Sequence, residues 1–380
     1  MTNRRNFLKS IALLGTAATL PSTNLFAESI LAPKPIGDGL TVVRHSAEIN
    51  RKKDPPRVIT IPDVGEFKVL KGDFHMHTYF SDGKVMPQDR VHEAIDNGLD
   101  VIAITDHIES ENRELRYRAN RNRSYDLAKV EADKNNLILV RGGEITKPAW
   151  HFNAIFLQDV NALAAVKDDW RKMLAVSVEQ GGFNFWNHPS WIDRTPDTPP
   201  FGLKSGEPMR FHAEIEEDRK NGLIHGIEVF NGVSHFPIAL DWCKERNLIP
   251  VTVTDIHQSD WNTYGHQNPL RPMSLILAKD RSYESVKEAF FAGRIVGWAA
   301  NMVLGLSPWV EQLFRSCVAI QKTNSGVSLK NLSDIPCLIE ANGKSAEIAA
   351  KETLSIAATK SFTVSNWFVG TNKSLEVTVG

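Results

Sequence analysis

Cysteine is scarce in this chain, and its three copies exclude a disulfide framework. Cys243, Cys317 and Cys337 are odd in number and far apart, whereas disulfide-stapled folds are short chains with an even set of cysteines. None of the three lies near the histidine and acidic residues described below. A hydrophobic core must therefore hold the chain together, and 380 residues with 42% hydrophobic content can supply one.

An excess of either charge is also absent, as is a long apolar run beyond the N-terminal segment. Lysine and arginine number 44 against 45 acidic residues, which gives a formal net charge of −1, whereas nucleic-acid-binding domains are usually basic. No later stretch reaches the roughly 20 apolar residues that span a bilayer. We therefore expect no nucleic-acid partner and no stable membrane anchor, and the sequence leaves the oligomeric state open.

The N-terminal residues 1–27 are typical of a secretory signal. A basic start with two adjacent arginines, Arg4 and Arg5, precedes a short apolar run that ends near Leu20 and small or polar residues up to Ala27. The order Arg-Arg-x-Phe-Leu-Lys resembles the twin-arginine version. No cysteine follows the run directly, which argues against a lipid anchor. We predict a periplasmic or secreted protein.

Strand-like and helix-like patterns alternate through the body of the chain. Short apolar runs predict strands at Val101–Thr105, Leu137–Val140, Phe152–Leu157, Gly182–Trp186, Ile227–Phe230 and Val251–Thr254. Helical periodicity between them predicts helices at Pro87–Asn97, Tyr125–Asn135, Val166–Glu179, Ile238–Arg246 and Tyr283–Ala292. Such repeated βα units indicate the α/β class, with a parallel sheet or a closed barrel.

The most informative segment opens on His75 and His77, continues with Asp82 and ends on Asp106-His107. Alternate residues of an extended strand point to the same side, so the two histidines of His-x-His can bind one cation. Asp82 and His107 are further oxygen and nitrogen ligands within reach. This pattern predicts a metal site.

Other candidate ligands stand where apolar runs begin or end, and they are Glu144, His151, His188, Asp255 and His257. The carboxyl ends of parallel strands share one face, so residues far apart in sequence can converge there. We favour a barrel, because a ring brings all these strands to one mouth. Each residue alone has an ordinary structural interpretation, and the ordered set favours metal binding. Glu228 is interpreted as a rim carboxylate and is left out of the predicted site.

In order, these residues resemble the motif series of the polymerase and histidinol phosphatase (PHP) family of phosphoesterases, over roughly residues 67–298. The resemblance implies a distorted TIM-like (β/α)7 barrel that binds two or three divalent metal ions. It implies a first ion on His75, His77, Glu144 and Asp255, a second on Asp82, His107 and His257, and a third on His151 and His188, with Glu144 bridging. Imidazole and carboxylate ligands without cysteine suit zinc, manganese or iron.

Paired divalent ions lower the pKa of a shared water toward about 7 and neutralise charge on phosphoryl oxygens. We predict that a metal-bridging hydroxide attacks phosphorus, with Asp255 and His257 as the catalytic residues and His257 or a metal ion assisting the leaving oxygen. Arg118 and Arg121 belong to an arginine-rich stretch at residues 112–125, and we predict that they bind the phosphate. A solvated basic face is the alternative for that stretch.

The predicted function is hydrolysis of small-molecule phosphate esters, with phosphodiesters preferred. An exported protein is poorly placed to be the histidinol phosphatase of amino-acid biosynthesis, but a phosphomonoesterase of that type stays an alternative. A second alternative is an amidohydrolase-like hydrolase of C–N or C–O bonds, whose metals are usually bridged by a carboxylated lysine. A third is a non-enzymatic metal-binding surface module.

A change in texture after Asn301 predicts a second domain. We divide the chain into a signal peptide at 1–27, an extended arm at 28–63, a barrel at 64–301, a linking helix at 302–320 and a small all-β domain at 321–380. Short alternating strands in the last segment favour a β-sandwich-like fold. That segment contains no ligand-like cluster.

Overall fold

The computed structural model describes residues 56–109, 120–146, 150–190, 209–264 and 271–379. The predicted signal peptide, most of the predicted arm and Arg118 lie outside the described residues, so export stays a prediction. Residues 55–380 form one compact unit. Within the described ranges, no helix combines the length and the apolar character that crossing a membrane requires.

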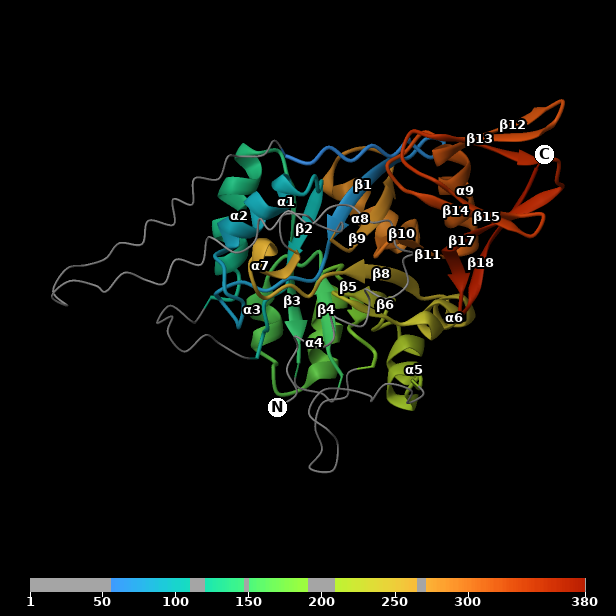
Figure 1. The fold of residues 1–380 in the computed structure, drawn as a ribbon. Coiled ribbons are helices and arrows are strands. Elements are labelled where there is room, and N and C mark those ends of the chain that lie inside the picture. The colour runs from blue at the N-terminus through green and yellow to red at the C-terminus, as the bar shows by residue number, and fades with distance from the viewer. Residues whose placement is uncertain (1–55, 110–119, 147–149, 191–208, 265–270, 380) are drawn as a thin grey trace, which may run out of the picture. The chain divides into compact units, whose positions relative to one another are not determined.

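A large mixed sheet organises the described residues (Figure 1). Its strands in the first part of the chain are β1 (Lys68–Asp73), β2 (Val101–Ile104), β3 (Ile138–Ile145), β4 (Phe152–Ile155), β5 (Phe183–Trp186), β6 (Gly226–Asn231), β7 (Ser234–His235), β8 (Ile249–Val253), β9 (Met273–Ala278), β10 (Ile295–Ala299) and β11 (Met302–Gly305). Their order in the sheet is β11-β10-β9-β1-β2-β3-β4-β5-β6-β7, with β8 on β6. The predicted α/β class is confirmed, with each of the six predicted strands present.

The sheet departs from an all-parallel barrel in two ways. β4 runs antiparallel to both β3 and β5, and β9 runs antiparallel to β1. The described strands also do not close into a ring by a continuous ladder, because β8 pairs with β6 and meets the β1 side through one isolated bridge, Met76 to Ile256. The prediction of a closed (β/α)7 barrel is therefore not confirmed.

Side-chain contacts take the place of the missing ladder between β8 and β9. The Ser274 hydroxyl accepts from the Thr252 amide at 3.0 Å and donates to the Thr252 carbonyl at 2.9 Å. Gly297 on β10 lies so close to Thr252 that a Cβ there would overlap the Thr252 side chain. The glycine thus permits the close approach that curls the sheet around its interior.

Helices follow most of the strands and cover the outer apolar side chains. They are α1 (Pro87–Asp96), α2 (Arg123–Lys134), α3 (Val160–Ala164), α4 (Trp170–Glu179), α5 (Ala213–Lys220), α6 (Pro237–Arg246), α7 (Asp260–Tyr264), α8 (Tyr283–Phe291) and α9 (Ser307–Cys317). Local sequence sets their starts: Pro87 and Pro237 occupy first helical positions, and the Ser282 hydroxyl accepts from the Ser285 amide at the start of α8. The predicted helix at Val166–Glu179 is shorter and begins at Trp170.

The last part of the chain is built from strands, as the sequence indicates. They are β12 (Val318–Thr323), β13 (Gly326–Asn331), β14 (Cys337–Ala341), β15 (Lys344–Ile348), β16 (Thr353–Ala357), β17 (Ser361–Gly370) and β18 (Lys373–Thr378). β17 pairs in parallel with β11, so four of these strands continue the large sheet, while β12, β13 and β16 form a second sheet. The sandwich-like fold of this segment and the domain boundaries stay predictions. All three cysteines are buried free thiols.

Candidate metal centre

The predicted ligands meet at one rim of the sheet. His75 and His77 follow β1 directly, His107 follows β2, and Glu144 lies near the end of β3. His151 stands before β4, and the antiparallel direction of that strand brings its start to the same rim. His188 follows β5, and Asp255 and His257 follow β8. Most of these positions are strand ends, where the ladder stops and a side chain is free to face its neighbours.

The carboxylate of Glu144 occupies the centre of the site. Its side chain is buried and 1% exposed. Five histidine rings approach its two oxygens at 2.8 to 3.5 Å: His75, His77, His107, His151 and His188. The Asn187 amide donates to Glu144 Oε1 at 2.8 Å and so fixes the orientation of the carboxylate. One acidic group therefore contacts rings from four separate segments.

Three groups of side chains have ligand atoms close enough to share an ion. The first ligand group is His75, His77 and Glu144, the second is His77, Asp82, His107 and His257, and the third is Glu144, His151 and His188. In each group these atoms lie within 4.8 Å of one another. Asp255 adjoins the first group, with Oδ1 at 3.2 Å from His75 Nε2 and 3.1 Å from His77 Nε2. The nine predicted metal ligands are thus brought together.

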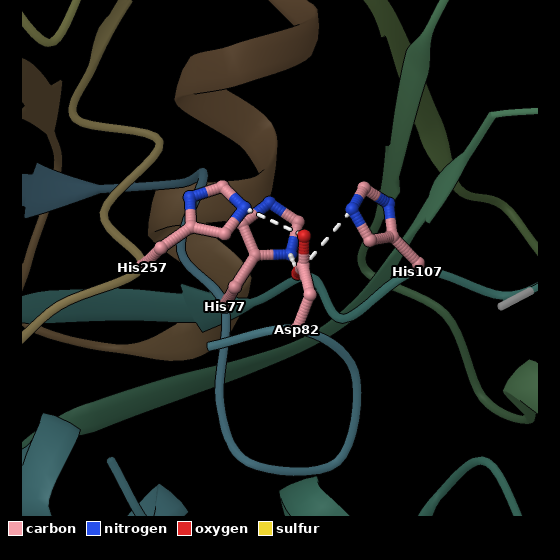
Figure 2. Close-up of side chains that lie close together, drawn as sticks. All are labelled: His77, Asp82, His107 and His257. Atoms are coloured by element: carbon pink, nitrogen blue, oxygen red, sulfur yellow. Dashed lines mark ion pairs between the residues drawn. The ribbon is translucent and has the colours of Figure 1, made fainter. Parts of the chain in front are cut away.

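The second ligand group is centred on Asp82, whose carboxylate lies between the rings of His107 and His257 (Figure 2). Asp82 Oδ1 lies 3.4 Å from His107 Nε2, and Asp82 Oδ2 lies 3.2 Å from His257 Nε2. His77 completes the group, with Nδ1 3.6 Å from Asp82 Oδ1. His77 therefore faces the first group with one ring nitrogen and the second group with the other.

Two of the candidate ligands have unusual backbone conformations. Asp255 has φ 53° and His188 has φ 27°, both positive values that side-chain-bearing residues seldom adopt. Such conformations cost free energy and persist where the surrounding structure imposes them, which is common at functional sites. Each follows a buried strand, and the His188 ring faces both acids, with Nε2 3.5 Å from Glu144 Oε1 and 4.0 Å from Asp255 Oδ2.

The electrostatics of the site favour ionised carboxylates. Burial opposes a charge on His75, but Asp255, Glu144 and Glu228 outweigh it and raise its pKa well above 6.5. For His77, burial and the neighbouring His107 lower the pKa to about 4. Burial would raise the pKa of Asp255, yet the nearby His75 and His77 hold it far below its usual range. A divalent ion would meet anionic oxygens and would displace protons from some of the rings.

Two side chains hold the backbone behind the ligands. Asp106, which the sequence placed only as a neighbour, accepts from the Thr78 amide and hydroxyl, each at 2.7 Å, and from the Ser81 hydroxyl at 2.7 Å. It thereby fixes the loop between His77 and Asp82. Arg90 of α1, 1% exposed, donates to the carbonyls of residues 77, 256 and 258 at 2.8 to 3.1 Å.

Glu228 is a residue of the site that the sequence interpretation missed. Instead of lying on the rim, it is fully buried on β6 and accepts from His75 Nδ1 at 2.7 Å. The sequence signal for this role was the position of Glu228 within the apolar run Ile227–Phe230. A charge in a strand that is buried throughout requires hydrogen-bonding partners.

The structure gives little support to the two arginines that were predicted to bind phosphate. Arg118 lies outside the described residues. Arg121 precedes α2, where its backbone amide donates to Asn161 Oδ1 at 2.7 Å. Its assignment to substrate binding stays a prediction.

The residues present fit divalent metal ions. His75 uses Nδ1 to donate to Glu228, so its Nε2 faces His77 Nε2 across 3.2 Å. Two ring nitrogens cannot face each other at this distance without a proton or a cation between them. Imidazole and carboxylate groups are the usual donors to zinc, manganese and iron, and the donor set does not select one of them.

Comparison with known proteins places the chain among metal-dependent enzymes. The PHP domain model matches residues 73–148, a span that includes His75, His77, His107 and Glu144. A two-domain protein from Bacteroides vulgatus, which contains a predicted PHP-like metal-dependent phosphoesterase, is 31% identical. That similarity covers 85% of this chain and 98% of the other, with a TM-score of 0.76. No curated protein matches the chain.

Two further solved structures show weaker similarity. A provisionally assigned metal-dependent phosphoesterase from Bifidobacterium adolescentis is 17% identical, covering 52% of this chain and 90% of its own, with a TM-score of 0.38. An amidohydrolase from Chromobacterium violaceum is 13% identical, covering 51% of this chain and 90% of its own, with a TM-score of 0.35.

Proposed function

We propose that this chain, which belongs to the PHP family of metal-dependent phosphoesterases, hydrolyses small phosphate esters and prefers phosphodiesters. The observation that carries the proposal is the gathering of three ligand groups around the carboxylate of Glu144, which belongs to two of them and lies 2.8 Å from His107 of the other. When bound, divalent ions would acidify a water molecule and neutralise negative charge on the phosphoryl oxygens. This is the chemistry that phosphate-ester hydrolysis requires.

The roles of the protein groups follow from their positions. We assign His75, His77, Glu144 and Asp255 to a first ion. Asp82, His107 and His257 would hold a second, and His151 and His188 would hold a third together with Glu144. In the amidohydrolase alternative a carboxylated lysine bridges the ions, and here the central position is taken by Glu144. That difference supports phosphoester chemistry.

His257 serves this reaction better as a ligand than as an acid. Its Nδ1 lies 2.8 Å from the Asp255 carbonyl oxygen, which can only accept, so the proton of the neutral ring belongs on Nδ1. Nε2 then carries the lone pair and faces Asp82. While Nε2 binds an ion it has no proton to give to a leaving oxygen. We therefore assign His257 to metal binding through Nε2.

The preference for diesters rests on charge. A phosphomonoester dianion calls for cationic side chains beside the ions, whereas a diester carries one negative charge. Within the described part of the chain, the ion pairs of Asp82, Glu144 and Asp255 all involve histidine, and none includes a lysine or an arginine.

The Asp255→Asn variant tests the proposal. Asparagine tolerates positive φ, so it suits the φ of 53° at this position, and it removes only the charge and one acceptor. Loss of a ligand to the ions is expected to remove several kcal/mol of transition-state stabilisation, a drop of at least about 1,000-fold in hydrolysis. Circular dichroism should show the folded state retained. Full activity in this variant would refute the assigned mechanism.

The substrate class is measured on the metal-loaded wild type. We expect nitrophenol release from bis-p-nitrophenyl phosphate to exceed release from p-nitrophenyl phosphate. Faster release from the monoester would instead favour a phosphatase, and release only from a p-nitrophenyl carboxylic ester or anilide would favour an amidohydrolase-like enzyme. Silence on every substrate would favour a metal-binding module.

A further inference from the structure

Glu228 lies in the interior of the sheet, where an acid needs a specific reason to be present. Every residue of β6 is buried, and Ile227 and Val229 pack into the apolar core on its outer side. The alternation of the strand turns Glu228 to the opposite, inner side. The pairing of β6 with β8 shifts its register between Glu228 and Phe230, and such a bulge re-aims a side chain.

Three hydrogen-bond donors meet the Glu228 carboxylate. His75 Nδ1 lies 2.7 Å from Oε1, the His188 backbone amide lies 2.5 Å from Oε2, and Asn231 Nδ2 lies 2.8 Å from Oε2. The backbone amide and the asparagine NH2 can only donate in these contacts. Oε2 thus accepts from both of them, which leaves Oε1 to face the His75 ring. In such a carboxylate–histidine pair the ring donates, so His75 presents its proton on Nδ1.

Those contacts reach two different ligand groups. His75 belongs to the first group, and its proton on Nδ1 leaves Nε2 with a lone pair toward Glu144 and Asp255. His188 belongs to the third group, and its backbone, at φ 27°, is held by the other oxygen of Glu228. One carboxylate therefore fixes the tautomer of one ligand and the main-chain position of another.

We propose that Glu228 is a positioning residue that couples the first and third ligand groups, so that a change at its carboxylate weakens ion binding at both. The inference rests on the proposed metal-binding role of those groups. The inference goes beyond that role, because the first and third ligand groups would share the support of Glu228 and would not bind their ions independently. Partners of metal-binding histidines typically change metal affinity by about 10-fold to 100-fold when they are replaced.

Glutamine is the informative replacement, because it keeps the shape and exchanges one acceptor for a donor. The amide NH2 must then face either His75 Nδ1 or the His188 amide. In the first case His75 moves its proton to Nε2 and loses the lone pair that binds the first ion. In the second case the strained backbone at His188 loses its partner, and the third group loosens. Glu144 belongs to both groups, so we expect a loss in either one to weaken the other as well.

The experiment compares the wild type, Glu228→Gln and Asp218→Asn as zinc is titrated against a chromogenic chelator. Asp218 is a matched control, since it is also a buried carboxylate, 1% exposed, but it pairs with Arg171 instead of a candidate ligand. Histidine ¹⁵N NMR reports which rings coordinate zinc. We expect affinity at the first and third groups to fall about 10-fold to 100-fold in Glu228→Gln, with coordination by His257 retained and Asp218→Asn unchanged.

Several results would overturn the proposal. These are wild-type zinc affinity in Glu228→Gln, a loss at one of the two groups alone, or an equal loss in Asp218→Asn. If Glu228→Gln does not fold, the zinc-loaded wild type decides, because His75 must carry its proton on Nδ1, and an Nε2-protonated ring would refute the coupling. Failure of the wild type to bind zinc would refute the proposed function itself, a separate outcome.

Discussion

The first and second ligand groups use the same kinds of side chain in opposite surroundings. His75 and His77 are 0% exposed and Glu144 is 1% exposed. In the second group Asp82 is 52% exposed, His257 34% and His107 14%. The first group is thus enclosed by protein, while the second opens to solvent.

The difference in exposure indicates that the two groups have different roles. Hydrogen bonds from protein groups orient the enclosed group, with Glu228 on His75 and Asn187 on Glu144. Such fixed ligands bind an ion without further ordering. The open group is the one whose side chains an ester can reach from solvent. We therefore expect that an ion bound at the first group would dissociate more slowly than one bound at the second.

The largest expected effect comes from Asp82→Asn, which removes the central acid of the open group alone. We expect the open group to lose its ion while the enclosed group keeps its own. Hydrolysis should fall about 1,000-fold, since an ion supplies several kcal/mol to the transition state. Metal analysis and the rate on bis-p-nitrophenyl phosphate measure the two effects.

Asp63→Asn is the control for this variant, because Asp63 is 47% exposed and pairs with Lys68 away from the ligand groups. It should match the wild type in both measurements. Equal loss of ions from both groups in Asp82→Asn would break the distinction between an enclosed and an open group.

The ligands of both groups could be predicted from sequence because their chemistry is specific to residue type and their places are marked by apolar runs. Asp106-His107 and the Asp255-x-His257 pair each follow an apolar run that was predicted as a strand. The strand β1 before His75 was not predicted, and there the His-x-His pattern itself marked the site. Strand direction could not be read in this way. The apolar run at Phe152–Ile155 has the same pattern in either direction, so the antiparallel course of β4 was not predicted.

The role of Glu228 and the absence of a continuous closing ladder among the described strands were not predicted, for a related reason. Periodicity assigns residues to two faces of a strand but does not say which face becomes the interior of a curved sheet. Glu228 could be a rim acid or a buried support, and only the positions of His75 and His188 decide. The contact between β8 and β9 likewise depends on hydrogen bonds of the Ser274 side chain that leave no periodic signal.

The dependence of zinc affinity on pH should separate the groups. Two rings of the open group, those of His107 and His257, are disfavoured as cations by burial. The carboxylates of Glu144 and Asp82 nevertheless raise the pKa of His107 well above 6.5, and those of Asp82 and Asp255 raise the pKa of His257. In the enclosed group the pKa of His75 is raised, whereas the pKa of His77 is lowered to about 4. Above pH 6.5 an ion must displace two protons from the open group and one from the enclosed group.

Affinity should therefore rise by about 100-fold per pH unit at the open group and about tenfold at the enclosed group, until the raised pKa values are passed. Competition titrations at several pH values measure both slopes. The stability of the metal-free protein has the opposite trend. A histidine whose pKa is higher in the folded state than in the unfolded state stabilises the folded protein below pH 6.5. That contribution is lost as the pH rises through the folded-state pKa. Equal slopes for the two groups would contradict the comparison.

The smallest expected effect comes from a change at the side chain that orders the backbone of the open group. Arg90 is the candidate, because its guanidinium binds the carbonyls of Ile256 and Gln258, on either side of His257, and that of His77. Arg90→Lys keeps the charge beside Glu93, but an ammonium cannot reach three carbonyls in the geometry of the planar fork. We expect open-group affinity to fall about threefold to tenfold.

Arg294→Lys supplies the matched comparison for Arg90→Lys. Arg294 directly precedes β10 and is also buried. It donates to the Leu277 carbonyl at 2.9 Å and pairs with Glu288. Both lysine variants should lower the melting temperature, since each loses hydrogen bonds to buried carbonyls. Only Arg90→Lys should weaken zinc binding at the open group. If the two variants bind zinc alike, Arg90 acts on stability alone, and the order of the open group must come from the ion itself.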